Sequence, residues 1–173
     1  RSDGAELVVT GCMAERYAGE LADALPEADA VVGFGVPVTL GATRGGAAAP
    51  SLDLLNLPRP PAAAPWAYVK VAEGCDRACG FCAIPSFRGA FRSRRPESVI
   101  EEARALAARG VREISLIAQD SSHYGRDLGL ADGLAELLER LDRLEELRWI
   151  RVHYLYPNSV TPQDLLAAQR VLD

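Results

Sequence analysis

Three of the four cysteines in this chain lie within eight positions, at Cys75, Cys79 and Cys82. They follow the alternating segment 67–72, which predicts a strand, so the cysteines fall on the loop after it. Thiolates spaced by three and then two residues can hold one corner of a cubane iron–sulfur cluster. Because no fourth cysteine is near, one iron of a 4Fe–4S cluster would keep an open position for a non-protein ligand, as catalytic metal sites do.

Other interpretations of this spacing stay open. A zinc site would need a fourth ligand, for which His123 or His153 is available. A ferredoxin-like electron carrier would need a further cysteine and a different spacing. The three thiols could also be structurally inert, although a loop flanked by glycine is a poor place to bury them. The spacing favours the cluster with an open iron.

Composition and charge exclude several classes of protein. The formal net charge of −5 argues against a surface devoted as a whole to nucleic acid. No apolar stretch approaches the roughly 20 residues that span a bilayer, and the segment 1–4 has no signal-peptide pattern. We therefore expect a cytoplasmic protein without a membrane partner. In that reducing compartment, cysteines are ligands or nucleophiles more often than disulfides.

The chain divides into three parts by periodicity. Residues 1–40 contain a strand at 7–9, a turn at Gly11–Cys12, an amphipathic helix and a second strand at 30–32. Gly, Ala and Pro accumulate in residues 41–65, which predicts a linker. Residues 66–173 then repeat a strand–loop–helix pattern.

That repeat predicts an α/β fold with parallel strands joined by right-handed crossovers. Strands are expected at 67–72, 114–118 and 149–154. One long loop is expected from the first strand to Arg95. A helix follows from Pro96 to an end at Gly110, with Val99, Ile100 and Ala103 on its apolar face. Further helices are expected over 134–144 and after Thr161, which is the expected cap of the last one. An open sheet and part of a (β/α) barrel fit equally well.

Polar side chains cluster where these strands end. The cysteine loop, the pair Gln119–Asp120 and the segment 153–157 all follow carboxyl ends of parallel strands, which meet at one rim. Gln119 and Asp120 are candidates to bind a cofactor there. His153 and Tyr154 are candidates to line the cavity. The basic residues of 88–95 could contact an acidic partner or the cofactor, or could simply be solvated.

The segments 73–89 and 93–94 resemble the radical S-adenosylmethionine methylthiotransferase family. The resemblance implies that Cys75, Cys79 and Cys82 hold a radical 4Fe–4S cluster whose open iron binds S-adenosylmethionine. It places Phe81 near the adenine of that cofactor. Residues 11–14 resemble the last ligand of a second, auxiliary 4Fe–4S cluster, so Cys12 is read as its ligand. No catalytic side chain is assigned.

The resemblance also implies a partial (β/α) radical barrel preceded by the end of a small α/β cluster-binding domain. It covers most of the chain but only part of the family's length. The first two auxiliary-cluster ligands and the terminal β-barrel of the family are not in this sequence. We therefore expect an internal fragment of a longer enzyme, which is not expected to be complete on its own.

Two branches of the family differ in substrate. The segments 117–125 and 151–157 are similar to the branch that modifies an aspartate of a small-subunit ribosomal protein. The resemblance implies a methylthio group added to the β-carbon of an aspartate in protein number twelve of that subunit, with a reductant protein such as flavodoxin or ferredoxin. The branch that modifies adenosine in transfer RNA is the disfavoured alternative, as is a non-catalytic zinc-binding module.

Overall fold

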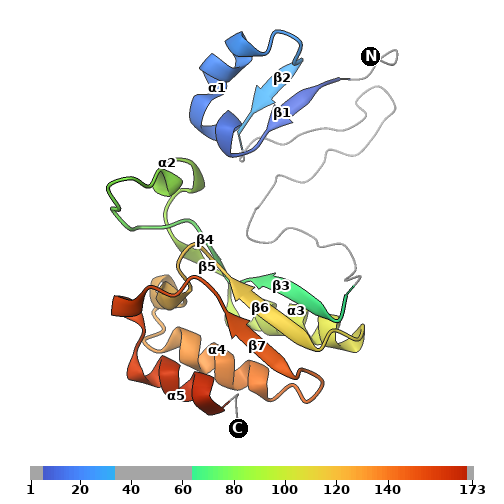
Figure 1. The fold of residues 1–173 in the computed structure, drawn as a ribbon, viewed down its shortest axis with the longest axis vertical. Coiled ribbons are helices and arrows are strands. Elements are labelled where there is room, and N and C mark those ends of the chain that lie inside the picture. The colour runs from blue at the N-terminus through green and yellow to red at the C-terminus, as the bar shows by residue number, and fades with distance from the viewer. Residues whose placement is uncertain (1–5, 34–63, 171–173) are drawn as a thin grey trace.

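The computed structural model describes residues 6–33 and 64–170 of the chain (Figure 1). Nearly all of the predicted linker 41–65 lies outside the described residues, as does the end of the predicted domain 1–40. In the described part, no helix is both long enough and apolar enough to cross a membrane.

The first described unit is a short parallel strand–helix–strand motif. Strand β1 (Val8–Thr10) pairs in parallel with β2 (Ala30–Val32), and helix α1 (Cys12–Ala24) connects them. The backbone N–H of Leu7 donates to the carboxylate of Asp29 at 2.7 Å, which ties the two strands at their start. The two strands and one helix predicted from the sequence are confirmed.

The second unit is built on three parallel strands, as the sequence predicted. Strands β3 (Trp66–Lys70), β6 (Glu113–Ile117) and β7 (Trp149–Val152) lie in the order β3-β6-β7. Helices α3 (Pro96–Ala108) and α4 (Gly133–Asp142) cover one face of the sheet, and α5 (Pro162–Arg170) packs against α4 (Figure 1). The predicted α/β fold class is confirmed.

The core lies between the sheet and these helices. Val69, Ile114 and Leu116 point into it and are fully buried, and each large aliphatic side chain buried in this way stabilises the fold by about 1.5–3 kcal/mol. The helices contribute their apolar faces: Val99, Ile100, Ala103, Leu106, Leu134, Leu137, Leu138 and Leu141. Alternate residues of the edge strands point to the opposite face, where Trp66 and Trp149 are exposed.

Helix α3 has the ends that its sequence predicts. Pro96 opens it, where the missing N–H costs nothing. Gly110 follows with a φ of +94°, and its N–H donates to Ala107 O at 2.9 Å. The N–H of Val111 donates to Leu106 O at 3.1 Å. This pair of bonds is a Schellman motif, which needs a left-handed residue and therefore favours glycine.

Helix α5 begins with a reciprocal cap. The N–H of Asp164 donates to Thr161 Oγ1 at 3.1 Å, and the N–H of Thr161 donates to Asp164 Oδ2 at 2.8 Å. This capping box satisfies two N–H groups that a helix start otherwise leaves without partners. The predicted cap at Thr161 is confirmed.

The segment between β3 and α3 was predicted as one long loop, and that prediction is wrong. It contains strand β4 (Ala72–Glu73), helix α2 (Ile84–Arg88) and strand β5 (Arg92–Ser93), and β4 pairs with β5 in antiparallel fashion. Elements of two to five residues are too short to show a hydrophobic period. Three single-turn 3₁₀ helices, Ser121–His123, Arg126–Leu128 and Pro157–Ser159, were missed for the same reason.

Candidate iron–sulfur site at the sheet rim

The cysteine loop leaves β4 through a glycine that no other residue can replace without strain. Gly74 has a φ of +80°, and a Cβ placed on it would meet Ala90 O at 2.1 Å. The next residue is anchored at once, because the N–H of Cys75 donates to Gly89 O at 3.1 Å. The β4–β5 hairpin therefore holds the first cysteine against the returning chain.

The three thiols lie along this loop without forming one compact set. Cys75 and Cys82 are half-buried and Cys79 is exposed. A turn joins the last two, in which the N–H of Cys82 donates to Cys79 O at 3.1 Å. Within residues 6–33 and 64–170, no group of three or more His, Cys, Asp or Glu side chains is gathered as a metal site. The predicted ligand roles of the three cysteines stay predictions.

A cavity of about 360 Å³ adjoins two of these thiols at the carboxyl ends of the strands. Its walls come from the cysteine loop, the loop after β6 and the segment after β7, so the three predicted polar segments do meet at one rim. The lining residues are Cys75, Asp76, Arg77, Ala78, Cys79, Phe91, Asp120, His123 and Tyr156.

Asp120 is the buried charge of this cavity. Its side chain accepts a hydrogen bond from Arg77 Nε at 2.7 Å and others from the backbone N–H and the hydroxyl of Ser122. Burial alone would raise the pKa of Asp120, but these hydrogen bonds and the neighbouring positive charge outweigh it and hold the pKa below its ordinary value. Asp120 therefore presents a fixed negative charge to the cavity.

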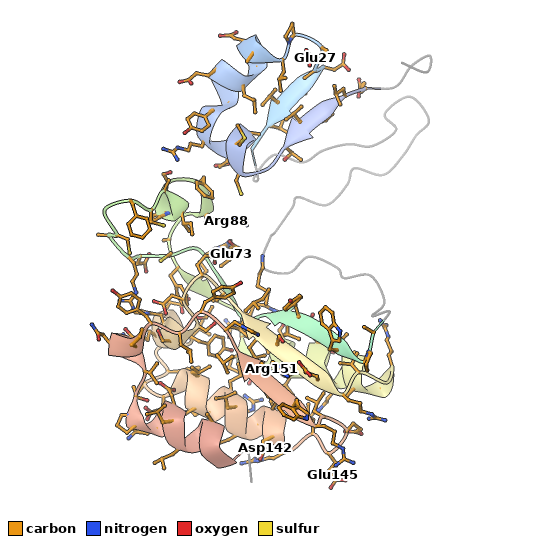
Figure 2. All side chains as sticks on the ribbon, in the orientation of Figure 1. Glu27, Glu73, Arg88, Asp142, Glu145 and Arg151 are labelled. Carbon is orange, nitrogen blue, oxygen red and sulfur yellow. The ribbon has the colours of Figure 1, made fainter. Side chains whose placement is uncertain are left out.

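Gln119 does not line the cavity, and its amide nitrogen donates to a buried carboxylate beside the loop. Glu73 is 1% exposed and accepts from Lys70 Nζ at 2.6 Å, Arg88 Nη1 at 3.3 Å and Gln119 Nε2 at 3.0 Å. Figure 2 shows Glu73 and Arg88 facing one another at the base of the cysteine loop. In the described part of the chain, Gln119 Oε1 is buried without a hydrogen-bond partner. The predicted cofactor contact of Gln119 is untested.

Two other predicted site residues lie outside the cavity wall. The Phe81 ring is 97% exposed, next to the last cysteine of the loop. Cys12 begins α1 and is half-buried. Helix α1 contacts α2, the helix that follows Cys82 by one residue. The predicted roles of Phe81 and Cys12 stay predictions.

The segment after β7 contributes a different residue from those predicted. His153 and Tyr154 are exposed and do not line the cavity, whereas Tyr156 does. Tyr154 has a φ of +62°, an uncommon conformation for a bulky residue, and its carbonyl accepts from the N–H of Ser121 at 3.0 Å. This turn draws the segment toward the loop after β6.

Two arginines of the basic run after the cysteines have structural partners. Arg94 is 8% exposed and donates to Lys70 O at 2.9 Å, to Ser98 Oγ at 2.8 Å and to Glu102. Arg88 is paired with the buried Glu73. Neither a solvated loop nor a partner-binding surface describes Arg94.

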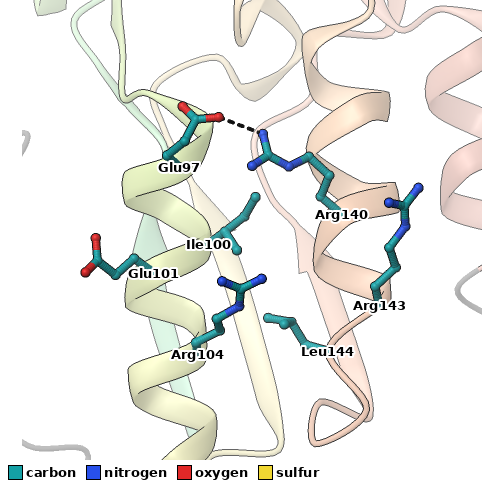
Figure 3. Close-up of a pocket in the computed structure, with 7 residues that line it drawn as sticks. All are labelled: Glu97, Ile100, Glu101, Arg104, Arg140, Arg143 and Leu144. Carbon is teal, nitrogen blue, oxygen red and sulfur yellow. Dashed lines mark hydrogen bonds and ion pairs between the residues drawn. The ribbon is translucent and has the colours of Figure 1, made fainter.

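A second cavity, of about 410 Å³, lies on the outer surface between α3 and α4 (Figure 3). It contains none of the predicted site residues. The Glu97–Arg140 ion pair, at 3.0 Å, crosses it, and Ile100 and Leu144 form its floor.

Comparison with known proteins gives a consistent result. The Radical SAM superfamily model matches residues 69–170. The chain is 47% identical over 188 residues to the ribosomal protein uS12 methylthiotransferase RimO of Solibacter usitatus (strain Ellin6076), covering 96% of this chain and 38% of that protein. It is 42% identical over 209 residues to the RimO of Koribacter versatilis (strain Ellin345), covering 90% of this chain and 42% of that protein.

Among solved structures, the chain resembles a radical S-adenosylmethionine methyltransferase, TsrM, from Kitasatospora setae. The identity is 19%, the TM-score is 0.48, and the match covers 60% of this chain and 20% of that one. The chain thus spans about two fifths of the length of the curated relatives named above.

The cofactors of this superfamily are a 4Fe–4S cluster and S-adenosylmethionine, and the rim offers donors of the right kind. Three thiols stand at the spacing that leaves one iron open. Two of them adjoin a cavity in which lining residues are hydrogen-bonded to each other, as Arg77 is to Asp120. Because Gly74 has no Cβ, the start of the cysteine loop can pass close to Ala90 O. The type of these donors and their spacing in the sequence therefore fit this pair of cofactors.

Proposed function

We propose that this chain, which belongs to the radical SAM superfamily, is the cluster-binding part of an enzyme that methylthiolates ribosomal protein uS12. The observation that carries the proposal is the set of three cysteines on the loop that opens into the rim cavity. Identities of 42–47% to RimO proteins, over 90% or more of this chain, support the choice of reaction and substrate.

The site residues have separate tasks in this proposal. Cys75, Cys79 and Cys82 hold the radical cluster, and S-adenosylmethionine occupies the adjoining cavity. When bound, the two cofactors supply the one-electron chemistry that removes hydrogen from an unactivated carbon. Asp120 presents its fixed charge to the cavity and orients what binds there. Gln119 supplies a buried amide oxygen, and Phe81 an exposed ring beside the cofactor.

The small unit has its own part in the proposal. Cys12 is the ligand of an auxiliary 4Fe–4S cluster in a domain that ends near residue 40. Residues 41–65 connect it to the radical domain, which starts at 66. The contact between α1 and α2 supports a close approach of the two units, since α2 follows the cysteine loop directly.

The substrate is an aspartate β-carbon of the small-subunit protein uS12, and the compartment is the cytoplasm. Electrons come from a reductant protein such as flavodoxin or ferredoxin. Transfer RNA is the disfavoured alternative substrate. The choice of uS12 as substrate is supported by the name of the relatives, ribosomal protein uS12 methylthiotransferase.

The test starts with anaerobic reconstitution of this chain. Iron and sulfide are measured, and the electron paramagnetic resonance spectrum of the reduced protein is recorded with and without S-adenosylmethionine. We expect roughly four irons per chain and a spectrum that changes with the cofactor. Zinc in place of iron, or a spectrum indifferent to the cofactor, would contradict the radical site.

The substrate is tested next on a longer form that includes this chain. Purified uS12 and bulk transfer RNA are offered in separate reactions, and products are read by mass spectrometry. We expect the methylthio mass increment on uS12 alone. An increment on transfer RNA alone would contradict the substrate and leave the radical chemistry standing.

A further inference from the structure

Arg77 lies between two of the proposed cluster ligands, two residues after Cys75 and two before Cys79. Its side chain is 24% exposed, so most of it is withdrawn from water. Its own N–H approaches Cys75 Sγ at 3.5 Å. An arginine at this place moves only with the loop that carries the thiols.

The guanidinium of Arg77 is held from two other segments by hydrogen bonds. Its Nε donates to Asp120 Oδ2 at 2.7 Å, and its Nη2 donates to Ser159 Oγ at 2.7 Å. Nδ1 of His123 lies 3.1 Å from Nη2 and 2.8 Å from Asp120 Oδ2. Because a guanidinium only donates, the neutral ring nitrogen can accept from Arg77, whereas the protonated one donates to Asp120. The loop after β6 and the segment after β7 both bind this one group.

The flat face of the same guanidinium is also used. Arg77 Cζ lies 3.7 Å from the centroid of the Tyr156 ring, a stacked cation–π contact. A planar fork that hydrogen-bonds at its edge while stacking on a ring is a geometry that lysine cannot reproduce. The contacts therefore select for arginine rather than for positive charge alone.

We propose that Arg77 is a positioning residue, which fixes the cysteine loop to the loop after β6 and to the segment after β7. It thereby sets where the cluster stands relative to the cavity that receives S-adenosylmethionine. This inference rests on the proposed radical site. Arg77 touches no reacting atom in this role, and the three cysteines alone are sufficient to hold iron. Its removal therefore affects cofactor engagement more than cluster content.

The test compares two substitutions of Arg77 with a matched control. Arg77→Ala removes the side chain, and Arg77→Lys keeps the charge but loses the fork. Arg104→Ala, in the cavity between α3 and α4, removes an exposed arginine that does not line the rim cavity. Each chain is reconstituted, its iron is measured, and S-adenosylmethionine is titrated while the resonance spectrum of the reduced cluster is followed.

We expect all three variants to keep the iron content of the unsubstituted chain. The half-saturating concentration of S-adenosylmethionine should rise about ten-fold or more in Arg77→Ala and nearly as much in Arg77→Lys, since a small misplacement of a reacting group is costly. It should not change in Arg104→Ala. Asp120→Asn should raise it as well, and the double variant with Arg77→Ala should be little worse than either single one, because both remove the same contact.

Two results separate the failure of this inference from the failure of the proposed function. If the unsubstituted chain binds no iron, or its spectrum does not change with S-adenosylmethionine, the proposed radical site is wrong and so is this inference. If the unsubstituted chain responds and both Arg77 variants respond at the same concentration, Arg77 does not position the loop. A loss of iron in Arg77→Ala, restored in Arg77→Lys, would also overturn the inference, since it would make the charge a support for folding alone.

Discussion

The rim cavity and the cavity between α3 and α4 are similar in size and differ in almost everything else. The rim cavity measures about 360 Å³ and the one between α3 and α4 about 410 Å³. Each contains an arginine–carboxylate pair. At the rim, the side chains of Arg77 and Asp120 are 24% and 6% exposed, whereas those of Arg140 and Glu97 are 40% and 70% exposed. Volume does not distinguish the two cavities; the convergence of buried charged groups at the rim does.

Both carboxyls have a lowered pKa, in opposite surroundings. The pKa of Asp120 is lowered although burial alone would raise it, because Ser122 and Arg77 hydrogen-bond its charged form. The pKa of Glu97 is lowered by a backbone hydrogen bond in the first turn of α3 and then by Arg140, in full contact with water. The Arg77–Asp120 pair holds a buried charge in one position, whereas the Glu97–Arg140 pair is a solvated surface ion pair.

The largest expected effect concerns the thiols at the rim. Replacement of Cys75, Cys79 and Cys82 together by Ala should reduce reconstituted iron from roughly four atoms per chain to near zero. The measurement is iron and sulfide content after desalting. Cys12→Ala is the matched control and should keep the radical cluster. Equal iron in the triple variant and the unsubstituted chain would place the cluster elsewhere.

The next effect concerns the backbone that delivers those thiols. Gly74→Ala combines a left-handed φ with a Cβ 2.1 Å from Ala90 O, so it should destabilise the fold by about 2 kcal/mol or more. Thermal unfolding of the apo chain measures the loss. Gly80→Ala in the same loop meets nothing within 4 Å among the described residues and is the control. Equal melting temperatures for the two variants would show that the hairpin can shift to make room.

A smaller effect sets the two ion pairs against each other. Asp120→Asn leaves Arg77 largely buried without its counter-charge and should cost about 2 kcal/mol of unfolding free energy. Glu97→Gln should lower the urea midpoint much less, because both partners are solvated. The comparison is made by urea unfolding at neutral pH. If Glu97→Gln cost as much as Asp120→Asn, burial would not be what separates the two cavities.

The smallest effect is the response of the two carboxyls to salt. Raising ionic strength from about 0.1 M to about 1 M shortens the screening length from about 10 Å to about 3 Å. The pKa of Glu97 should move upward toward its ordinary value, and the pKa of Asp120 should move less. Carbon-13 NMR titration of the side-chain carboxyls measures both. A larger shift at Asp120 would mean that water enters the rim cavity freely.

Much of the fold could be predicted because its signals are local and periodic. The apolar face of α3, at Val99, Ile100 and Ala103, is buried as expected. The proline and glycine that bound this helix act within one turn of their own positions. Three strand–helix repeats then leave few parallel topologies to choose from. The rim followed from those topologies, since parallel strands carry their loops at the same edge.

The side chains of the rim could be predicted only in part. Cys75, Cys79 and Asp120 line the cavity, and their spacing or place at a strand end indicated them. Tyr156 and Arg77 were missed, because their contact joins positions that lie far apart in the sequence, and no local pattern records it. The only available signal for Arg77 was its place between two cysteines. Its partners depend on how the segment after β7 turns.

That turn has a consequence for how the sequence can vary. Tyr154 has a positive φ, a backbone conformation that is strained for residues with a Cβ, and its side chain is 67% exposed. In a library of all substitutions at this position, selection for thermal stability alone should therefore enrich Gly, Asn and Asp, the residues that tolerate such a φ. An aromatic residue kept there across many generations would be evidence of selection for something other than stability.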